Sequence, residues 1–475
     1  MALDAVLSLL KSRERESVDR LIDWLKIPSV STDPAYAPHC RRAAEWCAGQ
    51  LRRAGLARVE LHETGSPQKP GHPIVYAHHP GPAGFAGPHM LFYGHYDVQP
   101  ADPLELWESP PFEPVIRPAT PGGPGERVVA RGAVDDKGQV ACFLEAALAW
   151  KDAAGELPCS VTVLIEGEEE SGSKNLYAYV DQHKAGLKAD VCVISDTGMP
   201  SATQPGITYG VRGLAYFEVT LTGPNQDLHS GLWGGKVPNA INELTGVLSQ
   251  LWDASRRVQL PGFYDKVREP GADERAAWKT LPYDAIGMLK KIGLPPEADI
   301  GEAGWSALER EWARPTCDIN GIWGGYTGEG SKTVIAGKAH AKVSFRLVAD
   351  QDPTDVQRQF RAFLDARTPP GCAWEVKDLS GGAGATVATD SPALHAARRA
   401  LKIAAGVEPV LIKSGGSIPV VGMLKTRLGM DTILMGFGLD NDRVHSPNEK
   451  FELACFRMGA RAHAALMHEF GQMKA

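Results

Sequence analysis

Long apolar runs are absent from this chain of 475 residues. A helix that spans a bilayer needs about 18 or more consecutive apolar residues, and no such stretch occurs, so no membrane partner is expected. The N-terminus also lacks the basic start, extended apolar centre and small-residue cleavage site of a signal peptide. Leu9, Leu10, Val18, Leu21 and Leu25 instead recur at helical spacing, which predicts an amphipathic helix at the start of the chain.

A strong charge of one sign and paired cysteines are missing as well. The formal net charge is −7, which is mild for this length, and no basic stripe stands out, so no nucleic-acid partner is expected. The eight cysteines are scattered and form no CxxC pair. This pattern disfavours a disulfide framework and favours a reduced, cytoplasmic location.

The composition is that of an ordinary globular protein, with 43% apolar and 23% charged residues, and the length predicts two or three domains. Four apolar runs are typical of strands, and helical stretches lie between or after them. These runs are residues 88–93, 159–165, 190–194 and 432–437. Such alternation predicts an α/β fold with a mostly parallel sheet.

The middle of the chain follows a different pattern. Residues 216–222 alternate between apolar and polar side chains, and residues 342–347 also have the character of a strand. Helical pieces lie between and after such strands. This arrangement predicts an α+β domain at residues 213–390, inserted into a domain that is formed by residues 1–212 and 391–475.

Acidic or histidine side chains follow the apolar runs, or a nearby turn, in five places. They are His95 with Asp97, Asp135 with Asp136, Glu168 with Glu169 and Glu170, Asp196, and His445. In open parallel sheets the carboxyl ends of the strands converge on one crevice, so these side chains are expected to gather there. Buried carboxylates without partners are costly, and a cation neutralises them. Mixed histidine and carboxylate ligands suit zinc, with manganese or cobalt as alternatives.

Each of these places has an ordinary explanation when it is taken singly. Asp135 and Asp136 are typical of a turn or a helix N-cap, three consecutive glutamates are typical of a solvated surface, and His445 could belong to a surface loop. Their shared position after strands favours a metal site over these separate explanations.

Eight segments resemble, in the same order, the dinuclear zinc peptidases of the carnosine dipeptidase and cytosolic non-specific dipeptidase group. The segments are YGHYDVQPA at 93–101, RGAVDDKG at 131–138, EEESGS at 168–173, SD at 195–196, DLHSG at 227–231, SFRLV at 344–348, GGSIP at 415–419 and HSPNE at 445–449. Aminoacylase, succinyl-diaminopimelate desuccinylase and carboxypeptidase G are more distant relatives of that group. The resemblance implies an enzyme that hydrolyses the amide bond of dipeptides or similar small peptides.

The resemblance also implies two divalent metal ions and assigns their ligands. Asp135 is expected to bridge the two metals. His95 and Asp196 would complete the coordination of one metal, and Glu170 and His445 that of the other. Zinc is the expected metal, with manganese or cobalt possible.

Further residues near these ligands receive roles from the same resemblance. Asp97 is expected to orient His95 by hydrogen bonding. Glu169 is expected to be the general base, which takes a proton from a metal-bridging water and passes it to the leaving amine. Glu168 receives no role. The peptide bond between Asp135 and Asp136 is typically cis in this family.

The inserted domain is implied to act as a lid and dimerisation domain. His229 would reach into the active site of the partner subunit and stabilise the oxyanion there, so a homodimer is expected. Arg346 would bind the terminal carboxylate of the substrate, for which its fork of donors is suited. Thr333 is a second expected contact, and Gly416 and Ser417 of a glycine-rich loop would line the substrate pocket.

Two departures from the family pattern concern the substrate. Many cytosolic dipeptidases carry a glutamate directly before Gly-Gly-Ser that helps to recognise the free amino group, and here that position is Ser414. Carnosinase-type enzymes also carry a histidine near residues 380–383, where this chain has none. A deacylase of N-acyl amino acids is therefore the alternative function, and a non-catalytic binding protein is disfavoured because all five ligands and Glu169 are present.

Overall fold

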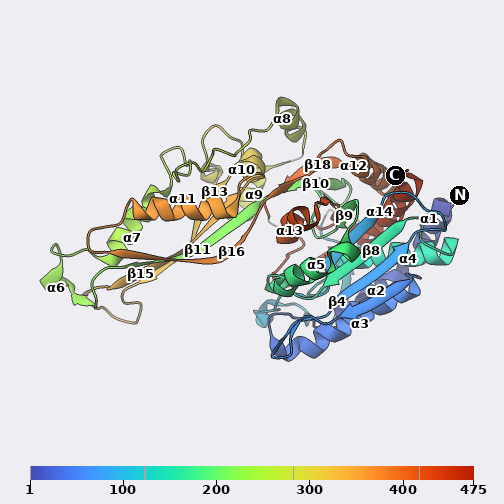
Figure 1. The fold of residues 1–475 in the computed structure, drawn as a ribbon, viewed down its shortest axis with the longest axis horizontal. Coiled ribbons are helices and arrows are strands. Elements are labelled where there is room, and N and C mark those ends of the chain that lie inside the picture. Colours follow the sequence, from blue (N-terminus) through green and yellow to red (C-terminus); the bar gives the residue numbers. More distant parts are fainter. Residues whose placement is uncertain (1, 122–124, 282, 417, 475) are drawn as a thin grey trace. The chain divides into compact units, whose positions relative to one another are not determined.

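The computed structural model describes residues 2–121, 125–281, 283–416 and 418–474 (Figure 1). The chain forms two compact units. The first consists of Met1–Tyr209, Val387–Ile412 and Leu424–Ala475, and the second of Gly210–Thr386 and Lys413–Met423. The predicted boundaries placed residues 413–423 in the first domain, whereas their contacts lie within the second unit.

The first unit is built on a large, mostly parallel sheet, as the alternation of apolar runs and helices predicts. Its strands lie in the order β1 (Arg58–His62), β4 (Ile74–Pro80), β8 (Ser160–Glu166), β5 (Met90–His95), β9 (Val191–Ile194), β19 (Asp431–Leu434) and β10 (Gly206–Val211). The four central strands β8, β5, β9 and β19 run parallel, and β1, β4 and β10 pair antiparallel. β17 (Ala385–Thr386) and β18 (Val410–Ser414) also pair with β10.

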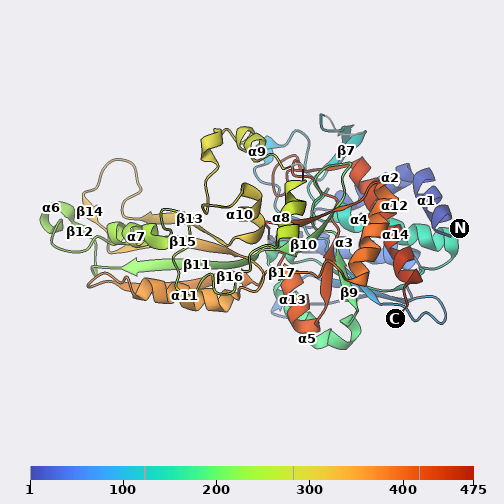
Figure 2. The ribbon, with the colours of Figure 1, turned by 90° about the horizontal axis from the view of Figure 1, so that it is seen from above.

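The central strands β8, β5 and β9 are buried along their whole length, and β19 is buried except at Asp431, because helices cover the sheet. The helices of this unit are α1 (Ala2–Ser12), α2 (Glu14–Leu25), α3 (Ala37–Arg53), α4 (Lys137–Ala154), α5 (Lys174–Leu187), α12 (Pro392–Ala405) and α14 (Leu453–Gln472). α4 packs between α1, α2, α3 and α14, and α12 lies beside α14 (Figures 1 and 2). The predicted opening helix is divided at Arg13, where the backbone leaves the helical conformation.

Helix α4 is buried on every side from Lys137 to Trp150, which explains its almost continuous apolar sequence. Its one buried glutamate, Glu145, accepts hydrogen bonds from Ser17 Oγ at 2.7 Å and from Arg20 Nε at 2.7 Å. A charge that is removed from water needs such partners. α2 is thereby joined to α4 by polar contacts as well as by packing.

The second unit is an α+β fold, again as predicted, around an antiparallel sheet. The strand order is β13 (Thr316–Gly324), β15 (Lys338–Leu347), β11 (Gly213–Thr222) and β16 (Ala373–Gly382). Buried and half-buried residues alternate strictly along β11, which is the period of a strand with one covered face. α7 (Ala240–Leu248) and α11 (Pro353–Asp365) share that core (Figure 2).

Shorter elements complete the two units. In the first they are β2 (Gly65–Ser66), β3 (Lys69–Pro70), β6 (Val115–Pro118), β7 (Glu126–Val129) and β20 (Lys450–Glu452). In the second they are β12 (Leu228–His229), β14 (Val334–Ile335), α6 (Ser230–Trp233), α8 (Ala272–Lys279), α9 (Ala285–Lys291) and α10 (Ala307–Ala313). Helix α13 (Pro419–Leu428) begins in the second unit and ends in the first. Among the described helices, none is both long and apolar enough to span a bilayer.

Candidate metal centre

Acidic and histidine residues lie at, or directly after, the carboxyl ends of the parallel strands in the first unit. His95 is the last residue of β5, Glu169 and Glu170 follow β8, and Asp196 follows β9. β5 lies between β8 and β9, so the three chain segments leave the sheet as neighbours. Carboxyl ends of adjacent parallel strands converge in this way at ligand sites.

The five predicted ligands come together as two groups that share Asp135. One group contains His95, Asp135 and Asp196, and the other contains Asp135, Glu170 and His445; within each group the candidate ligand atoms lie within 4.8 Å of one another. Asp135 Oδ1 lies 3.3 Å from His95 Nε2, and its Oδ2 lies 2.9 Å from His445 Nε2. The two oxygens of one carboxylate thus face different groups, which is the arrangement of a bridging ligand.

The burial and charge of these groups fit divalent cations. His95 Nε2 and Glu170 Oε1 are buried and have no hydrogen-bond partner among the described residues. Burial and the charge of Asp135 raise the pKa of Asp196 to about 7 and raise that of Glu170 as well. Crowded carboxylates resist ionisation unless a positive charge neutralises them. Imidazole and carboxylate donors in this number suit zinc or a similar metal.

Asp97 lies beside His95, and both side chains are completely buried. Its Oδ1 is 3.3 Å from His95 Nδ1, and the backbone carbonyl of Asp97 is 3.1 Å from the same nitrogen. The Asp97 carboxylate also accepts the backbone N–H groups of Glu169 at 3.3 Å and of Glu170 at 3.1 Å. Besides contacting His95, Asp97 therefore connects the end of β5 to the turn Glu169–Ser171, and the sequence pattern did not reveal this connection.

Glu169 occupies a short 3₁₀ turn, Glu169–Ser171, that places it next to Glu170. Burial, together with the charges of Asp196 and Glu170, raises the pKa of Glu169 well above its ordinary value. A carboxylate with a raised pKa accepts a proton more readily near neutral pH. Glu168 faces the other way, since its side chain accepts hydrogen bonds from His72 N and Asn175 Nδ2.

Glu449 supports the loop that carries Asp135, although the sequence suggested no role for it. Its carboxylate accepts the backbone N–H groups of Gly132, Val134 and Asp135 at 2.9–3.1 Å and pairs with Arg131 Nη1 at 2.7 Å. Both charged side chains are almost completely buried. The signal lay in the matching segments, because Glu449 follows His445 and Arg131 precedes Asp135.

Asp136 and Lys137 complete this loop. The peptide bond between Asp135 and Asp136 is cis, as the resemblance predicts. Asp136 Oδ2 accepts the backbone N–H of His95 at 3.2 Å. Lys137 Nζ donates to the carbonyl oxygen of Ile27 at 2.6 Å, and burial lowers the pKa of this amine to about 7.

The second unit carries the remaining predicted residues. His229 is exposed on β12, and its Nδ1 accepts the backbone N–H of Gly231 at 3.0 Å, which leaves the ring proton on Nε2. Thr333 directly precedes β14, which pairs with β12, and the Thr333 carbonyl accepts the N–H of Ser230 at 3.1 Å. Arg346 is half-buried on β15.

Gly416 follows β18, in the glycine-rich loop of residues 415–417 that was predicted to line the substrate pocket. Its carbonyl accepts the backbone N–H of Arg212 at 3.1 Å. Ser417, the other residue predicted in this loop, lies outside the described residues.

The chain from residue 91 to residue 469 matches the model of peptidase family M20/M25/M40. The chain belongs to this family. It is 30% identical to the Cys-Gly metallodipeptidase of Schizosaccharomyces pombe, over 100% of this chain and 99% of that protein.

Solved structures of the family resemble the fold. The human carnosine dipeptidase 1 structure has a TM-score of 0.80 and 29% identity, over 100% of this chain and 99% of that one. The metallo-carboxypeptidase Sso-CP2 from Sulfolobus solfataricus has a TM-score of 0.80 and 31% identity, over 96% of this chain and 99% of that one.

Replacing Asp97 by alanine is expected to weaken zinc binding. The change removes the carboxylate beside His95 and frees the turn that carries Glu170, and loss of such a partner typically lowers metal affinity by about 10–100-fold. Isothermal titration of the apoprotein with zinc measures the effect. Asp19→Ala, on the exposed side of α2, is the control. An unchanged zinc affinity in Asp97→Ala would contradict the supporting role of Asp97.

Proposed function

We propose that this chain, a metallodipeptidase of peptidase family M20/M25/M40, cleaves the amide bond of dipeptides or similar small peptides with Glu169 as the general base. The observation that carries this proposal is the sharing of Asp135 by two groups of potential ligands, with Glu169 beside them. Family membership over most of the chain supports the same reaction class.

His95, Asp135 and Asp196 would hold one divalent cation, and Asp135, Glu170 and His445 would hold a second. Zinc is the proposed metal, with manganese or cobalt as alternatives. When bound, such cations polarise the scissile carbonyl and lower the pKa of water. Asp97 keeps His95 and Glu170 in position for this binding.

Glu169 moves the proton. Its carboxylate takes a proton from the attacking water and later delivers it to the leaving amine. The raised pKa makes the Glu169 carboxylate a better proton acceptor, as a general base requires. Two features keep this side chain in place, namely the turn Glu169–Ser171 and the hydrogen bond from its backbone N–H to Asp97.

Glu169→Gln is expected to lower kcat by about 10²–10⁴-fold, since general-base catalysis contributes about that factor. The zinc content should stay near that of the wild type because Glu170, and not Glu169, belongs to the ligand groups. Glu168→Gln is the matched control, since the Glu168 side chain accepts hydrogen bonds from His72 and Asn175 and belongs to neither ligand group among the described residues. Wild-type turnover in Glu169→Gln would exclude Glu169 as the base.

We also propose that Arg346 binds the substrate carboxylate and that Thr333, Gly416 and Ser417 contact the substrate. His229 would serve the active site of the partner subunit in a homodimer. Its ring proton on Nε2 supports this role, because that nitrogen can donate to an oxyanion. A second support is the edge strand β13, which exposes the large apolar residues Ile322 and Trp323, as subunit interfaces commonly do.

Mixing two inactive variants tests the dimer. A mixed dimer of Glu169→Gln and His229→Ala would contain one site with both an intact base and an intact histidine from the other chain. Hydrolysis should therefore reappear when the two variants are refolded together, while each variant alone stays inactive. If the mixture remains as inactive as its components, His229 does not act across a dimer.

An N-acyl amino acid deacylase is the second candidate function, and Ser414 is the observation that favours it. A free ammonium group needs a partner of opposite charge when it leaves water, and serine provides none. Rates on Ala-Leu and on N-acetyl-Ala-Leu distinguish the candidates. The dipeptidase proposal predicts faster hydrolysis of the unblocked substrate, and hydrolysis of the blocked substrate alone would contradict it.

A cytoplasmic location is proposed as well. All eight cysteines are free, and seven of them are buried, which suits a reducing compartment.

A further inference from the structure

The loop that contains Gly415 and Gly416, which is proposed to line the substrate pocket, accepts hydrogen bonds from Arg212, a residue that is distant in the sequence. Arg212 donates its backbone N–H to the carbonyl oxygen of Gly416 at 3.1 Å and its side-chain Nε–H to that of Gly415 at 2.8 Å. Two consecutive carbonyls of the loop are therefore fixed by the same residue. Within the loop, Ser414 Oγ accepts the N–H of Gly416 at 3.1 Å.

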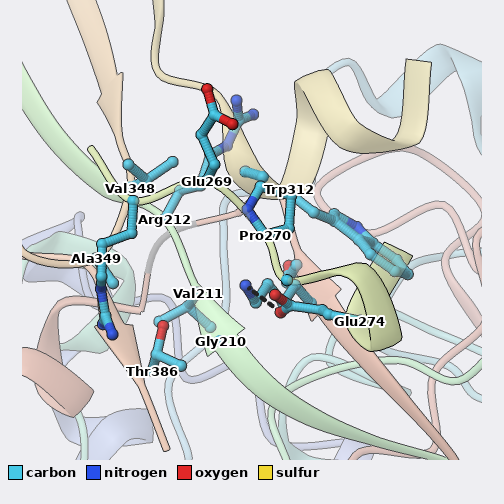
Figure 3. Close-up of a pocket in the computed structure, with 15 residues that line it drawn as sticks. Gly210, Val211, Arg212, Glu269, Pro270, Glu274, Trp312, Val348, Ala349 and Thr386 are labelled. Carbon is cyan, nitrogen blue, oxygen red and sulfur yellow. Dashed lines mark ion pairs between the residues drawn. The ribbon is translucent and has the colours of Figure 1, made fainter. Parts of the chain in front are cut away.

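The residues directly before Gly415 and Gly416 border a cavity. A cavity of about 260 Å³ in the second unit is lined by Arg212, Lys413 and Ser414. Trp312 of α10 and residues 268–271 line it as well (Figure 3). The ion pair of Lys413 Nζ with Glu274 Oε1, at 2.8 Å, spans part of the wall (Figure 3). Lys413 and Ser414, which lead into Gly415 and Gly416, therefore have fewer packing neighbours on this side.

Gly415 is packed tightly on its other side. A Cβ atom at this position would lie 2.8 Å from Glu311 Cγ, 3.0 Å from Glu311 Oε1 and 3.1 Å from Arg212 Nη2. Such distances are shorter than van der Waals contact. The loop backbone thus lies directly against the Arg212 guanidinium and the Glu311 carboxylate, and only glycine fits without displacing them.

The electrostatic surroundings of Arg212 are consistent with a fixed, charged side chain. Burial lowers its pKa to about 10, the charge of Glu311 opposes that shift, and the charge of Arg346 adds to it. Arg212 therefore stays charged at neutral pH. It also lies near the residue that is proposed to bind the substrate carboxylate, so the loop and Arg346 belong to one neighbourhood of the second unit.

We propose that Arg212 is a positioning residue for substrate binding, which holds the Gly415–Gly416 backbone in the position and orientation that the substrate contacts. This inference rests on the proposed function, in which Gly416 lines the substrate pocket. Arg212 acts through the loop and does not touch the reacting atoms. Its loss should therefore weaken substrate binding much more than the chemical step.

Three variants test the proposal by steady-state kinetics on a dipeptide. Arg212→Met removes the hydrogen bond to Gly415 and the charge. Arg212→Lys keeps the charge but loses the guanidinium Nε–H, and Gly415→Ala displaces the loop while all charges remain. Each is expected to raise KM about tenfold or more and to change kcat less than about threefold, the signature of lost binding without lost chemistry.

The double variant Arg212→Met/Gly415→Ala separates loop positioning from independent effects. If both residues act through the same loop, the double variant should raise KM little more than the stronger single variant, because coupled changes are not additive. Arg268→Met is the control, since this exposed arginine lines the same cavity but pairs with Asp350 Oδ2 at 2.6 Å. Its KM should equal that of the wild type.

Hydrogen–deuterium exchange of the segment that contains Gly415 and Gly416 gives a readout without substrate. Faster exchange of this segment in Arg212→Met, with exchange in the rest of the chain unchanged, would support the proposal. Absence of dipeptide cleavage by the wild type would contradict the proposed function but would leave this exchange result valid. Unchanged exchange in Arg212→Met would overturn the inference. Wild-type KM in Arg212→Lys would also overturn it, because charge alone would then suffice.

Discussion

The carboxylate of Asp135 is the centre on which the site depends, since each of its oxygens faces a different histidine. Asp196 and Glu170 add further negative charge at distances where carboxylates repel one another. Some buried nitrogen and oxygen atoms that could bind a metal, such as His95 Nε2, have no hydrogen-bond partner among the described residues. Two cations would neutralise these charges and bind these free nitrogen and oxygen atoms, so metal binding would explain why acidic and histidine residues gather at this end of the strands.

The surrounding fold restricts Asp135 and its neighbours with buried polar contacts. Glu449 fixes the loop before α4 through three backbone N–H groups, and Asp97 fixes the turn after β8 through two. Each carboxylate joins segments that are far apart in the sequence. Ligands that are held by such contacts bind metals more tightly, because less freedom is lost when the ion arrives.

Sequence reasoning recovered the parallel strands and the inserted antiparallel domain because apolar periodicity depends directly on burial. Strand-end placement predicted that the five acidic or histidine clusters would gather at one site, because strand ends converge in a parallel sheet. The choice of His95, Asp135, Glu170, Asp196 and His445 within those clusters came from the resemblance to the dipeptidase group. Glu449 lay within a matching segment, but its partners on the Asp135 loop were not predicted. The hydrogen bonds of Arg212 to Gly415 and Gly416 could not be predicted, because they join segments whose register no local pattern encodes. The break between α1 and α2 at Arg13 was missed for a similar reason, since both sides of the break continue the same apolar spacing.

Anomalous X-ray scattering at the zinc edge, from crystals of the zinc-loaded protein, tests the shared role of Asp135 most directly. The account predicts two peaks per chain, with one oxygen of Asp135 at about 2.0–2.2 Å from each, the usual distance of zinc–carboxylate bonds. His95 and Asp196 should contact one peak, and Glu170 and His445 the other. A single peak, or two peaks of which one lacks Asp135 as a ligand, would contradict it.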